Sequence, residues 1–262
     1  MQPFAIPLWL AGLYFLFRHA EGRAYRAFGW AYVILFVVFM LQHAKFYWMS
    51  SAYPPVFAAG AYAIQLLAQR RRLRWLQPSY TGLLTITSLA LVPLAIPLLP
   101  AESFIKYNAF LGNGANVKQE NIEIAELPQN YADRYGWLEM ATAVKGAYAA
   151  LSAEERGQAC IYTDNYGQAA AMDYFGPELG LPRAISGHNS YHIWGPQGCT
   201  GEVLITVGSD REDLIQYFES VDPGPAWSCQ YCLPGEDGRL ILIARGMKMP
   251  LDEVWPVTKW FY

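Results

Sequence analysis

The sequence predicts a membrane α-helical region of about four spans, followed by a soluble α/β domain in which helices flank a mostly parallel sheet. Charge is the first observation: among the 262 residues, positions 1–100 hold eight basic residues and one acid, net +7, whereas positions 101–262 hold eleven basic and 21 acidic residues, net −10. The second is a set of long apolar runs in the first part, and the third is the alternation of helix-like and strand-like segments in the second part. A basic, apolar part followed by an acidic, mixed part is typical of a membrane region joined to a water-exposed domain.

Four apolar runs cover most of the first hundred residues. They lie at 3–17, 28–41, 56–68 and 81–99. A membrane span needs roughly 20 apolar residues; the run 81–99 is close to that length and carries no charge, whereas the run 3–17 is short. The alternative is that the runs are buried helices of a water-soluble protein, and the charge-free length of 81–99 argues against it.

Two short basic segments set the expected orientation. Arginines are concentrated in the loop 18–26 and in the segment 69–74. Because basic loops stay on the cytoplasmic side of a membrane, we expect the segment 42–55 and everything after residue 100 to lie outside the cytoplasm. Basic residues confined to short loops between apolar runs do not indicate nucleic-acid binding.

The second part of the chain reads as a single α/β domain. We expect a transmembrane region at 1–100, a connector at 101–130 and an extracytoplasmic domain at 131–262. Strands separated by helices favour a largely parallel sheet. Within the domain, apolar periodicity predicts strands at 159–163, 203–207 and 240–244 and helices at 136–151, 168–179 and 210–220.

A polar and aromatic segment, residues 42–55, interrupts the apolar runs. At a lipid–water boundary Tyr and Trp rings are favoured, and a lysine can reach an anionic headgroup. These residues alone favour an interfacial anchor loop. The other hypothesis is a site for the phosphate of a lipid-linked substrate, with Lys45 and Tyr47 as its main ligands and His43 and Tyr53 as weaker ones.

A second polar group lies in the predicted domain, in the segment 185–196. Its His, Asn, Tyr and Trp residues suit a sugar or a polar headgroup, because flat aromatic faces and amide groups bind such ligands. The alternative, slightly favoured, is a hydrogen-bonded loop that caps the sheet edge. A further asparagine follows the first predicted strand, where ligands gather in open α/β sheets. The candidate acceptor-binding or sugar-binding residues are Asn165, His188, Asn189, Tyr191, His192 and Trp194.

Cys229 and Cys232 have two residues between them, in the order Cys-Gln-Tyr-Cys. An exterior location suits a local disulfide, and free thiols are the other main alternative. A thioredoxin-like redox pair would need the second cysteine to run into a helix, but Leu-Pro-Gly follows it. A structural zinc site needs four ligands, and Cys160 and Cys199 are distant in sequence. Because no phosphate-binding loop, nucleophile elbow or metalloprotease motif occurs, we expect no metal and no cofactor.

A set of short segments carries a family resemblance. In the membrane region these are Lys45-Phe46-Tyr47-Trp48, Ala52-Tyr53-Pro54 and Phe57-Ala58-Ala59-Gly60-Ala61, and in the domain they are 131–137, 165–169, 175–177, 184–196 and 251–256. Together they resemble the bacterial polyprenol-phosphate-sugar-dependent membrane glycosyltransferases, GT-C enzymes of glycosyltransferase family 39 akin to protein O-mannosyltransferases and to the lipid A aminoarabinose transferase. The resemblance covers nearly the whole chain, with Ser51 in place of the family's proline.

The resemblance implies transfer of a sugar from a polyprenyl-phosphate carrier to an acceptor outside the cytoplasm, at the bacterial inner membrane. It also implies a catalytic acid in an exterior loop of an N-terminal half, whereas the sole acid before residue 100, Glu21, is expected on the cytoplasmic side. The chain is therefore expected to correspond to the C-terminal half of such an enzyme, with the bilayer, the lipid-linked sugar and the N-terminal half as partners and with no catalytic residue assigned. The alternative is a non-catalytic, membrane-anchored module that binds a glycan or a protein.

Overall fold

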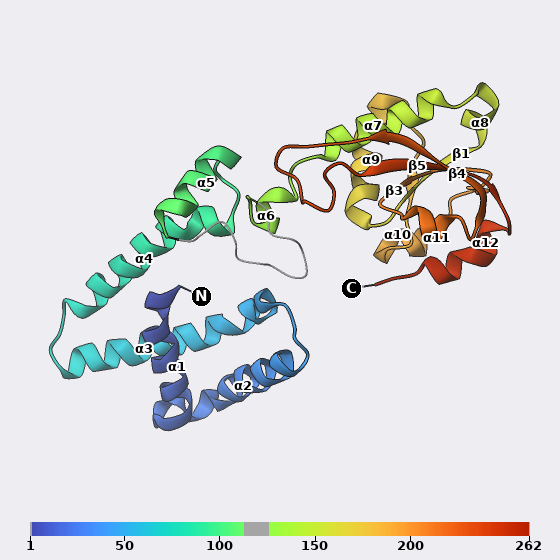
Figure 1. Cartoon of the computed structure of the whole chain (residues 1–262). Coiled ribbons are helices and arrows are strands. Elements are labelled where there is room, and N and C mark those ends of the chain that lie inside the picture. The colour runs from blue at the N-terminus through green and yellow to red at the C-terminus, as the bar shows by residue number, and fades with distance from the viewer. Residues whose placement is uncertain (1, 113–125, 262) are drawn as a thin grey trace. The chain divides into compact units, whose positions relative to one another are not determined.

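The computed structural model describes residues 2–112 and 126–261, which form two compact units, Met1–Ile96 and Pro97–Tyr262 (Figure 1). The segment expected as a connector is partly helical and belongs to the second unit. It holds α5 (Ala101–Phe110) and α6 (Gln129–Ala132), and the rings of Phe104 and Tyr131 stack with centroids 3.8 Å apart. The connector residues 113–125 lie outside the described residues.

Unit 1 consists of helices joined by short turns. Its order is η1 (Pro3–Ala5), α1 (Ile6–Arg18), η2 (Glu21–Tyr25), α2 (Arg26–Leu41), η3 (Phe46–Ala52), α3 (Tyr53–Arg70) and α4 (Leu76–Ala95). Its buried core is small and mostly aromatic and aliphatic, and it consists of Phe15, Leu16, Tyr32, Met49 and Val56.

The prediction of four membrane spans is wrong. In residues 2–112 and 126–261, only two helical stretches are long and apolar enough to cross a bilayer, Glu21–Leu41 and Leu76–Ala95. With 13 residues, α1 extends about 20 Å at the usual rise per residue, short of a hydrocarbon core of about 30 Å. α3 has 18 residues, but polar side chains such as Gln65 and Gln69 lower its hydropathy.

α1 crosses α3 steeply, and glycines allow the close approach (Figure 1). A Cβ atom at Gly12 would overlap the carbonyl oxygen of Val56, and a Cβ atom at Gly60 would overlap that of Leu8. Small residues at helix contacts let two backbones come together and replace side-chain interdigitation. The pairing of α1 with α3 therefore depends on the absence of side chains at these two positions.

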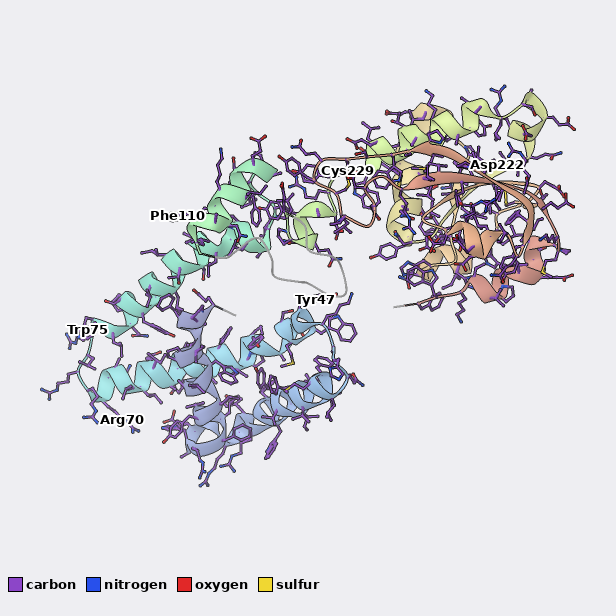
Figure 2. All side chains as sticks on the ribbon, viewed as in Figure 1. Tyr47, Arg70, Trp75, Phe110, Asp222 and Cys229 are labelled. Atoms are coloured by element: carbon purple, nitrogen blue, oxygen red, sulfur yellow. A yellow bond between two sulfur atoms is a disulfide. The ribbon has the colours of Figure 1, made fainter. Side chains whose placement is uncertain are left out.

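Many large apolar side chains of unit 1 are exposed on its surface. α4 has no buried residue, and α2 buries only Gly29 and Tyr32. Large contiguous apolar surfaces are rare on water-soluble monomers and mark contact with a membrane or a partner. The outward side chains project along the whole length of both helices (Figure 2); on α2 the large exposed ones are Phe28, Trp30, Ile34, Leu35, Phe36, Val37, Val38, Met40 and Leu41.

Unit 2 continues with an α/β arrangement. Its helices are α7 (Trp137–Ala150), α8 (Ala153–Gln158), α9 (Tyr166–Leu179), α10 (Asn189–Trp194), α11 (Arg211–Leu214) and α12 (Leu251–Val254), followed by η4 (Trp255–Thr258). Its strands are β1 (Ala159–Thr163), β2 (Ala184–Ile185), β3 (Val203–Val207), β4 (Phe218–Ala226) and β5 (Leu240–Met247). The expected helices at 136–151 and 168–179 correspond to α7 and α9.

The sheet is mixed, so the prediction of a mostly parallel sheet is wrong. The strand order is β2-β1-β3-β5-β4; β1 pairs in parallel with β2 and β3, whereas β5 pairs antiparallel with β3 and with β4. The reason is the connection after β4: residues 227–239 return the chain without a crossover helix, and a direct return makes neighbouring strands antiparallel. β5 then fits between β3 and β4.

The prediction of a helix at 210–220 is also wrong beyond the first turn of that segment. Only Arg211–Leu214 is helical, and β4 begins at Phe218. β4 contains Pro223 and Pro225, which cannot donate ladder hydrogen bonds, and such strands are confined to sheet edges. β4 is the edge strand, so its prolines are compatible with pairing on one side only.

Two apolar layers cover the sheet. On one face α7 and α9 pack on the odd residues of β3, and this larger core includes Met140, Val144, Met172, Ile161, Ile205 and Ile241. On the other face α11 covers Leu204, Leu242 and Ala244 with Phe218 and Val221 of β4. A disulfide joins Cys160 at the start of β1 to Cys199 before β3, and a second joins Cys229 to Cys232.

One ion-pair group ties three elements of unit 2 together and gives a pH-dependent stability. Arg245 of β5 donates from Nε to Glu155 Oε1 (2.7 Å) and from Nη1 to Asp222 Oδ2 (2.9 Å). The hydrogen bond from Arg245, with others from Ser152, lowers the pKa of Glu155 from 4.5 to about 2. A depressed carboxyl pKa stabilises the folded state above the unfolded value, and the stabilisation is lost as the pH falls from about 4.5 towards 2.

We therefore expect Glu155→Gln to make the stability of unit 2 less sensitive to acid between about pH 5 and pH 2. The measurement is the free energy of urea unfolding as a function of pH. Glu154→Gln is the matched control, because Glu154 is an exposed neighbour that also lies in the first turn of α8. Equal acid dependence in both variants and the unmodified chain would contradict the assignment.

Candidate functional site

The polar and aromatic segment 42–55 forms a compact helical connection between α2 and α3. The chain turns at His43, whose φ of 50° lies in the left-handed region, and Ala44 N–H donates to the carbonyl of Phe39 (2.9 Å). η3 follows, and Pro54 and Pro55 lie in the first turn of α3. Proline is well placed there, because the first N–H groups of a helix have no partner within it.

The structure separates the four candidate phosphate ligands into two groups. His43, Lys45 and Tyr47 are exposed on the connection, Tyr47 with 50% of its surface (Figure 2). Tyr53 lies further in, with its ring 5.6 Å from that of the buried Tyr32. The connection therefore presents an imidazole, an ammonium group and a phenol at its surface, whereas Tyr53 belongs to the packing of unit 1.

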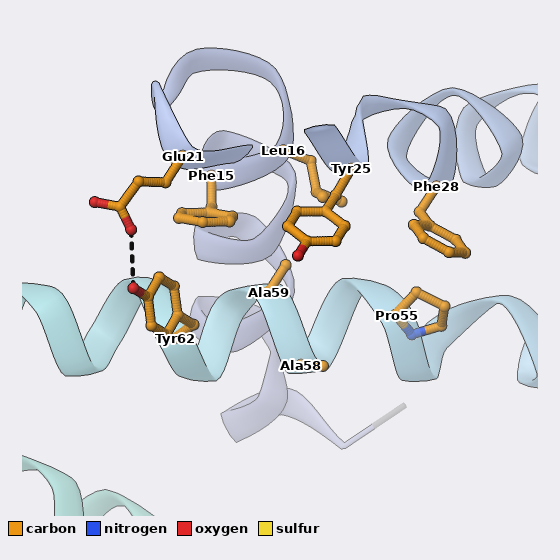
Figure 3. Close-up of a pocket in the computed structure, with 9 residues that line it drawn as sticks. All are labelled: Phe15, Leu16, Glu21, Tyr25, Phe28, Pro55, Ala58, Ala59 and Tyr62. Atoms are coloured by element: carbon orange, nitrogen blue, oxygen red, sulfur yellow. Dashed lines mark hydrogen bonds between the residues drawn. The ribbon is translucent and has the colours of Figure 1, made fainter. Parts of the chain in front are cut away.

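A cleft of about 600 Å³ lies beside this connection, along one face of α3. Figure 3 shows aromatic rings from α1, η2 and α2 standing over the small residues of α3. The hydroxyl of Tyr62 donates to Glu21 Oε2 (2.8 Å) at one end. The lining is otherwise apolar or aromatic: Phe15, Leu16, Tyr25, Phe28, Pro55, Ala58 and Ala59.

No local sequence pattern predicts this cleft. Its polar end joins Glu21 to Tyr62, which are 41 residues apart, and the contact arises only because α1 crosses α3. One available signal was that Glu21 is the sole acid of the first hundred residues. Along α3 the cleft extends from Pro55, just after η3, to Tyr62, about 10 Å at the usual helical rise.

The histidines of the segment 185–196 pack inside unit 2. His188 is buried, its ring stacks on Trp260 at 3.7 Å, and its Nδ1 accepts from the backbone N–H of Tyr166 (3.4 Å). Burial lowers the pKa of His188. His192 stacks on Trp255 at 5.5 Å. These contacts attach the segment to the C-terminal residues and to the start of α9.

The other candidates in this segment divide between the interior and the surface. Tyr191 is buried and its hydroxyl donates to Asp173 Oδ2 (2.9 Å); burial first, and then this bond, raises the pKa of Tyr191 to about 12. Asn189 has a φ of 51° and donates its N–H to the carbonyl of Trp260. Trp194 is 60% exposed and is the candidate ring that a ligand could reach most freely.

The Asn165 side chain caps the N-terminus of α9. Its side-chain oxygen accepts from Gln168 N–H (3.0 Å), and the Gln168 side chain returns to the N–H of Asn165. Such a capping box satisfies two N–H groups that a helix end leaves open. The Asn165 side chain therefore has a local structural role at the start of α9.

The Cys229–Cys232 disulfide lies against the start of α7. Gly136 has a φ of 89°, and a Cβ atom there would come within 2.9 Å of Cys229 Sγ and 2.7 Å of the Trp227 ring. The pair is therefore packed beneath a glycine turn. In residues 2–112 and 126–261, no group of three or more His, Cys, Asp or Glu side chains could hold a metal ion.

Comparison of the chain with protein-family models, with curated proteins and with solved structures found no match. The family resemblance therefore stands on the sequence segments alone. Three of those segments meet in unit 2: the start of α9 contacts the segment 184–196 through Tyr166 and His188, and the same segment contacts 251–256 through His192 and Trp255.

Proposed function

We propose that this chain is a membrane protein that binds a polyprenyl-phosphate-linked sugar and takes part in transferring the sugar to an acceptor outside the cytoplasm. The observation that carries the proposal is the exposure of Lys45 and Tyr47 directly after α2. The last residues of α2, Met40 and Leu41, are 64% and 77% exposed. A cation and a phenol that follow an outward apolar helix suit a phosphate at headgroup depth.

The proposal includes insertion of unit 1 in the bacterial inner membrane. The outward apolar faces of α2 and α4 support this insertion, because they would be unfavourable in water.

The cleft along α3 supplies a place for the first part of an apolar chain. It begins at Pro55, close in sequence to the exposed connection, and its walls are rings and small aliphatic groups. A carrier whose phosphate contacts Lys45 could lay its first isoprene units against Ala58 and Ala59. Burial of apolar surface would then add to a charge-assisted hydrogen bond at the phosphate.

In the reaction we propose, an acceptor hydroxyl attacks the anomeric carbon of the sugar while the bond from that carbon to the phosphate oxygen breaks. The polyprenyl phosphate leaves, and Lys45 stabilises its charge. The base that takes the hydroxyl proton is not assigned to this chain: Glu21 is the only carboxylate described in unit 1 and accepts a hydrogen bond from Tyr62. That observation favours the second candidate function, a non-catalytic, membrane-anchored module that binds a glycan or a protein.

We expect Lys45→Ala and Tyr47→Phe each to weaken binding of undecaprenyl phosphate to the chain in lipid nanodiscs. A charged hydrogen bond contributes about 1.5 kcal/mol at the low end, which suits an exposed site and corresponds to roughly tenfold in affinity. The measurement is a binding titration with the carrier lipid, repeated with phosphatidylglycerol to separate carrier recognition from general attraction to anionic lipid.

Arg74→Ala is the matched control, because Arg74 is an exposed cation that follows α3 at its other end. It should leave carrier affinity unchanged. Unaltered affinity in both Lys45→Ala and Tyr47→Phe would remove the proposed phosphate site. An equal loss in all three variants would indicate general electrostatic attraction instead.

A further inference from the structure

A second pocket lies in unit 2, at the point where the order in which strands are added to the sheet reverses. The chain leaves β1 through α9 to β2 on one side, then passes through α10 to β3 on the other side. In open α/β sheets, the connections on the two sides diverge at such a point, and ligands bind outside the carboxyl ends of the two strands. Here Asp164 follows β1, and Gly208 to Asp210 follow β3.

The pocket at this place has a volume of about 390 Å³ and two different walls. One wall is apolar and comes from β3, β5, α11, α12 and η4, with Leu204, Leu214, Met247, Leu251, Val254 and Val257. Its mouth carries the carboxylates of Asp164, Asp210 and Asp213 with the single guanidinium of Arg239.

Gly208 makes this mouth possible. Its φ is 91°, and a Cβ atom there would come within 2.6 Å of the Asp164 Cβ and 3.0 Å of Gln168 Oε1. The ends of β1 and β3 are also joined by a hydrogen bond from Asp164 N–H to the carbonyl of Val207 (2.9 Å). The Asp164 carboxylate is thus set between two strand ends.

Negative charge at the mouth exceeds positive charge. Arg239 Nη2 is 3.5 Å from Asp210 Oδ1, which offsets one carboxylate. Within the described residues, Asp164 and Asp213 have no ion-pair partner of their own. Burial raises the pKa of Asp164. The guanidinium of Arg239 lowers this pKa, whereas the negative charges of Asp210 and Asp213 raise it further.

An unsatisfied hydroxyl adds an independent observation. Thr206 is fully buried, and its Oγ1 has no hydrogen-bond partner among the described residues. Alternation along β3 puts Thr206 on the same face as Leu204, which lines the pocket, although Thr206 itself is not one of the lining residues. Buried polar side chains are satisfied in most proteins, so the unpaired hydroxyl of Thr206 indicates a hydrogen-bond partner, such as a bound water, on this face of β3.

We propose that this pocket binds a small organic cation, an ammonium group joined to an aromatic or aliphatic body. The carboxylates of Asp164 and Asp213 would hold the ammonium group, and the apolar wall would cover the body. A free inorganic cation would leave the apolar wall unused, and an anion would meet a net negative mouth.

Three probes of similar shape but different charge test the proposal on the full chain in nanodiscs: benzylamine, benzyl alcohol and benzoate. Isothermal titration is corrected with empty nanodiscs, because the neutral probe partitions into lipid. We expect saturable binding of benzylamine, at least roughly tenfold weaker binding of benzyl alcohol and still weaker binding of benzoate, since charged hydrogen bonds are about twice as strong as neutral ones.

Asp164→Asn and Asp213→Asn keep the side-chain shape and remove the charge, and each is expected to weaken benzylamine binding by roughly tenfold. Glu178→Gln is the control of equal charge change, at an exposed position of α9. Hydrogen exchange of the β1 and β3 amides checks that the variants fold. The proposal is overturned if benzylamine does not bind saturably, if benzyl alcohol binds as well, or if both folded Asn variants keep the original affinity.

Discussion

Gly60→Ala is expected to lower the stability of unit 1 by about 3 kcal/mol or more, as overpacking of a close contact does. The new methyl group would overlap the carbonyl oxygen of Leu8 and lie 3.1 Å from the Gly12 nitrogen. Both are backbone atoms, so no change of rotamer can relieve the contact, and α1 must move away from α3. Gly12→Ala should act in the same way through the carbonyl of Val56.

The displacement should reach the cleft. The ring contact of Phe15 with Tyr62 (5.3 Å) and the hydrogen bond of Tyr62 with Glu21 both bridge the crossing. Thermal unfolding and hydrogen exchange of α1 and α3, in nanodiscs, measure the effect.

Gly82→Ala in α4 is the control, because a Cβ atom there meets nothing within 4 Å. Alanine is a better helix former than glycine, so this variant should be neutral or up to about 1 kcal/mol more stable. If Gly60→Ala and Gly82→Ala behave alike, the glycine crossing is not what holds α1 on α3.

The sequence predicts correctly the strands whose apolar residue pattern does not depend on contacts with distant segments. β1 and β3 fall on the predicted residues because each is a short apolar run bounded by polar residues and glycine. β4 was missed because Pro223, Gly224 and Pro225 disfavour a strand in isolation. Only its edge position, which needs β5 as a neighbour, makes those residues acceptable.

The number of spans illustrates the same limit. The apolar runs at 3–17 and 56–68 have the composition of membrane helices. In the structure, however, the helices that they form, α1 and α3, pack against each other through Gly12 and Gly60, and Val56 is fully buried. Composition alone does not distinguish an apolar face covered by a helix from one that faces lipid. α2 packs on α1 through Gly29 but buries little else, and α4 has no buried residue; the stretches that contain them remain the two candidate spans.

The candidate sites follow this division. Lys45 and Tyr47 could be found from sequence because they are local interruptions of an apolar pattern. Asp164 precedes Asn165, the asparagine that follows the first predicted strand, where ligands gather in open α/β sheets. Other features depend on contacts between distant segments, and no local sequence pattern predicts them. They are the Glu21–Tyr62 pair, the position of Arg239 in the second pocket and the unpaired hydroxyl of Thr206.

Loss of the Cys160–Cys199 disulfide is expected to destabilise unit 2 by about 4 kcal/mol, from the entropy of closing a loop in the unfolded chain. The two cysteines are 39 residues apart, and the loop they close contains α9, β2 and α10. It therefore includes Asp164 and the whole segment 185–196. The bond also fixes the start of β1 to the residues that enter β3, which are neighbours in the sheet.

The test compares two double variants. Cys160→Ser/Cys199→Ser should lower the opening free energy of β1 and β3 amides, read from hydrogen exchange, by about 4 kcal/mol. Cys229→Ser/Cys232→Ser, with a separation of only three residues, should lower it by about 2 kcal/mol or less on the same relation. Reduction of the unmodified chain should reproduce the sum of both effects. Equal losses in the two variants, or unchanged exchange of β1 and β3 without Cys160 and Cys199, would contradict the role assigned to the longer loop.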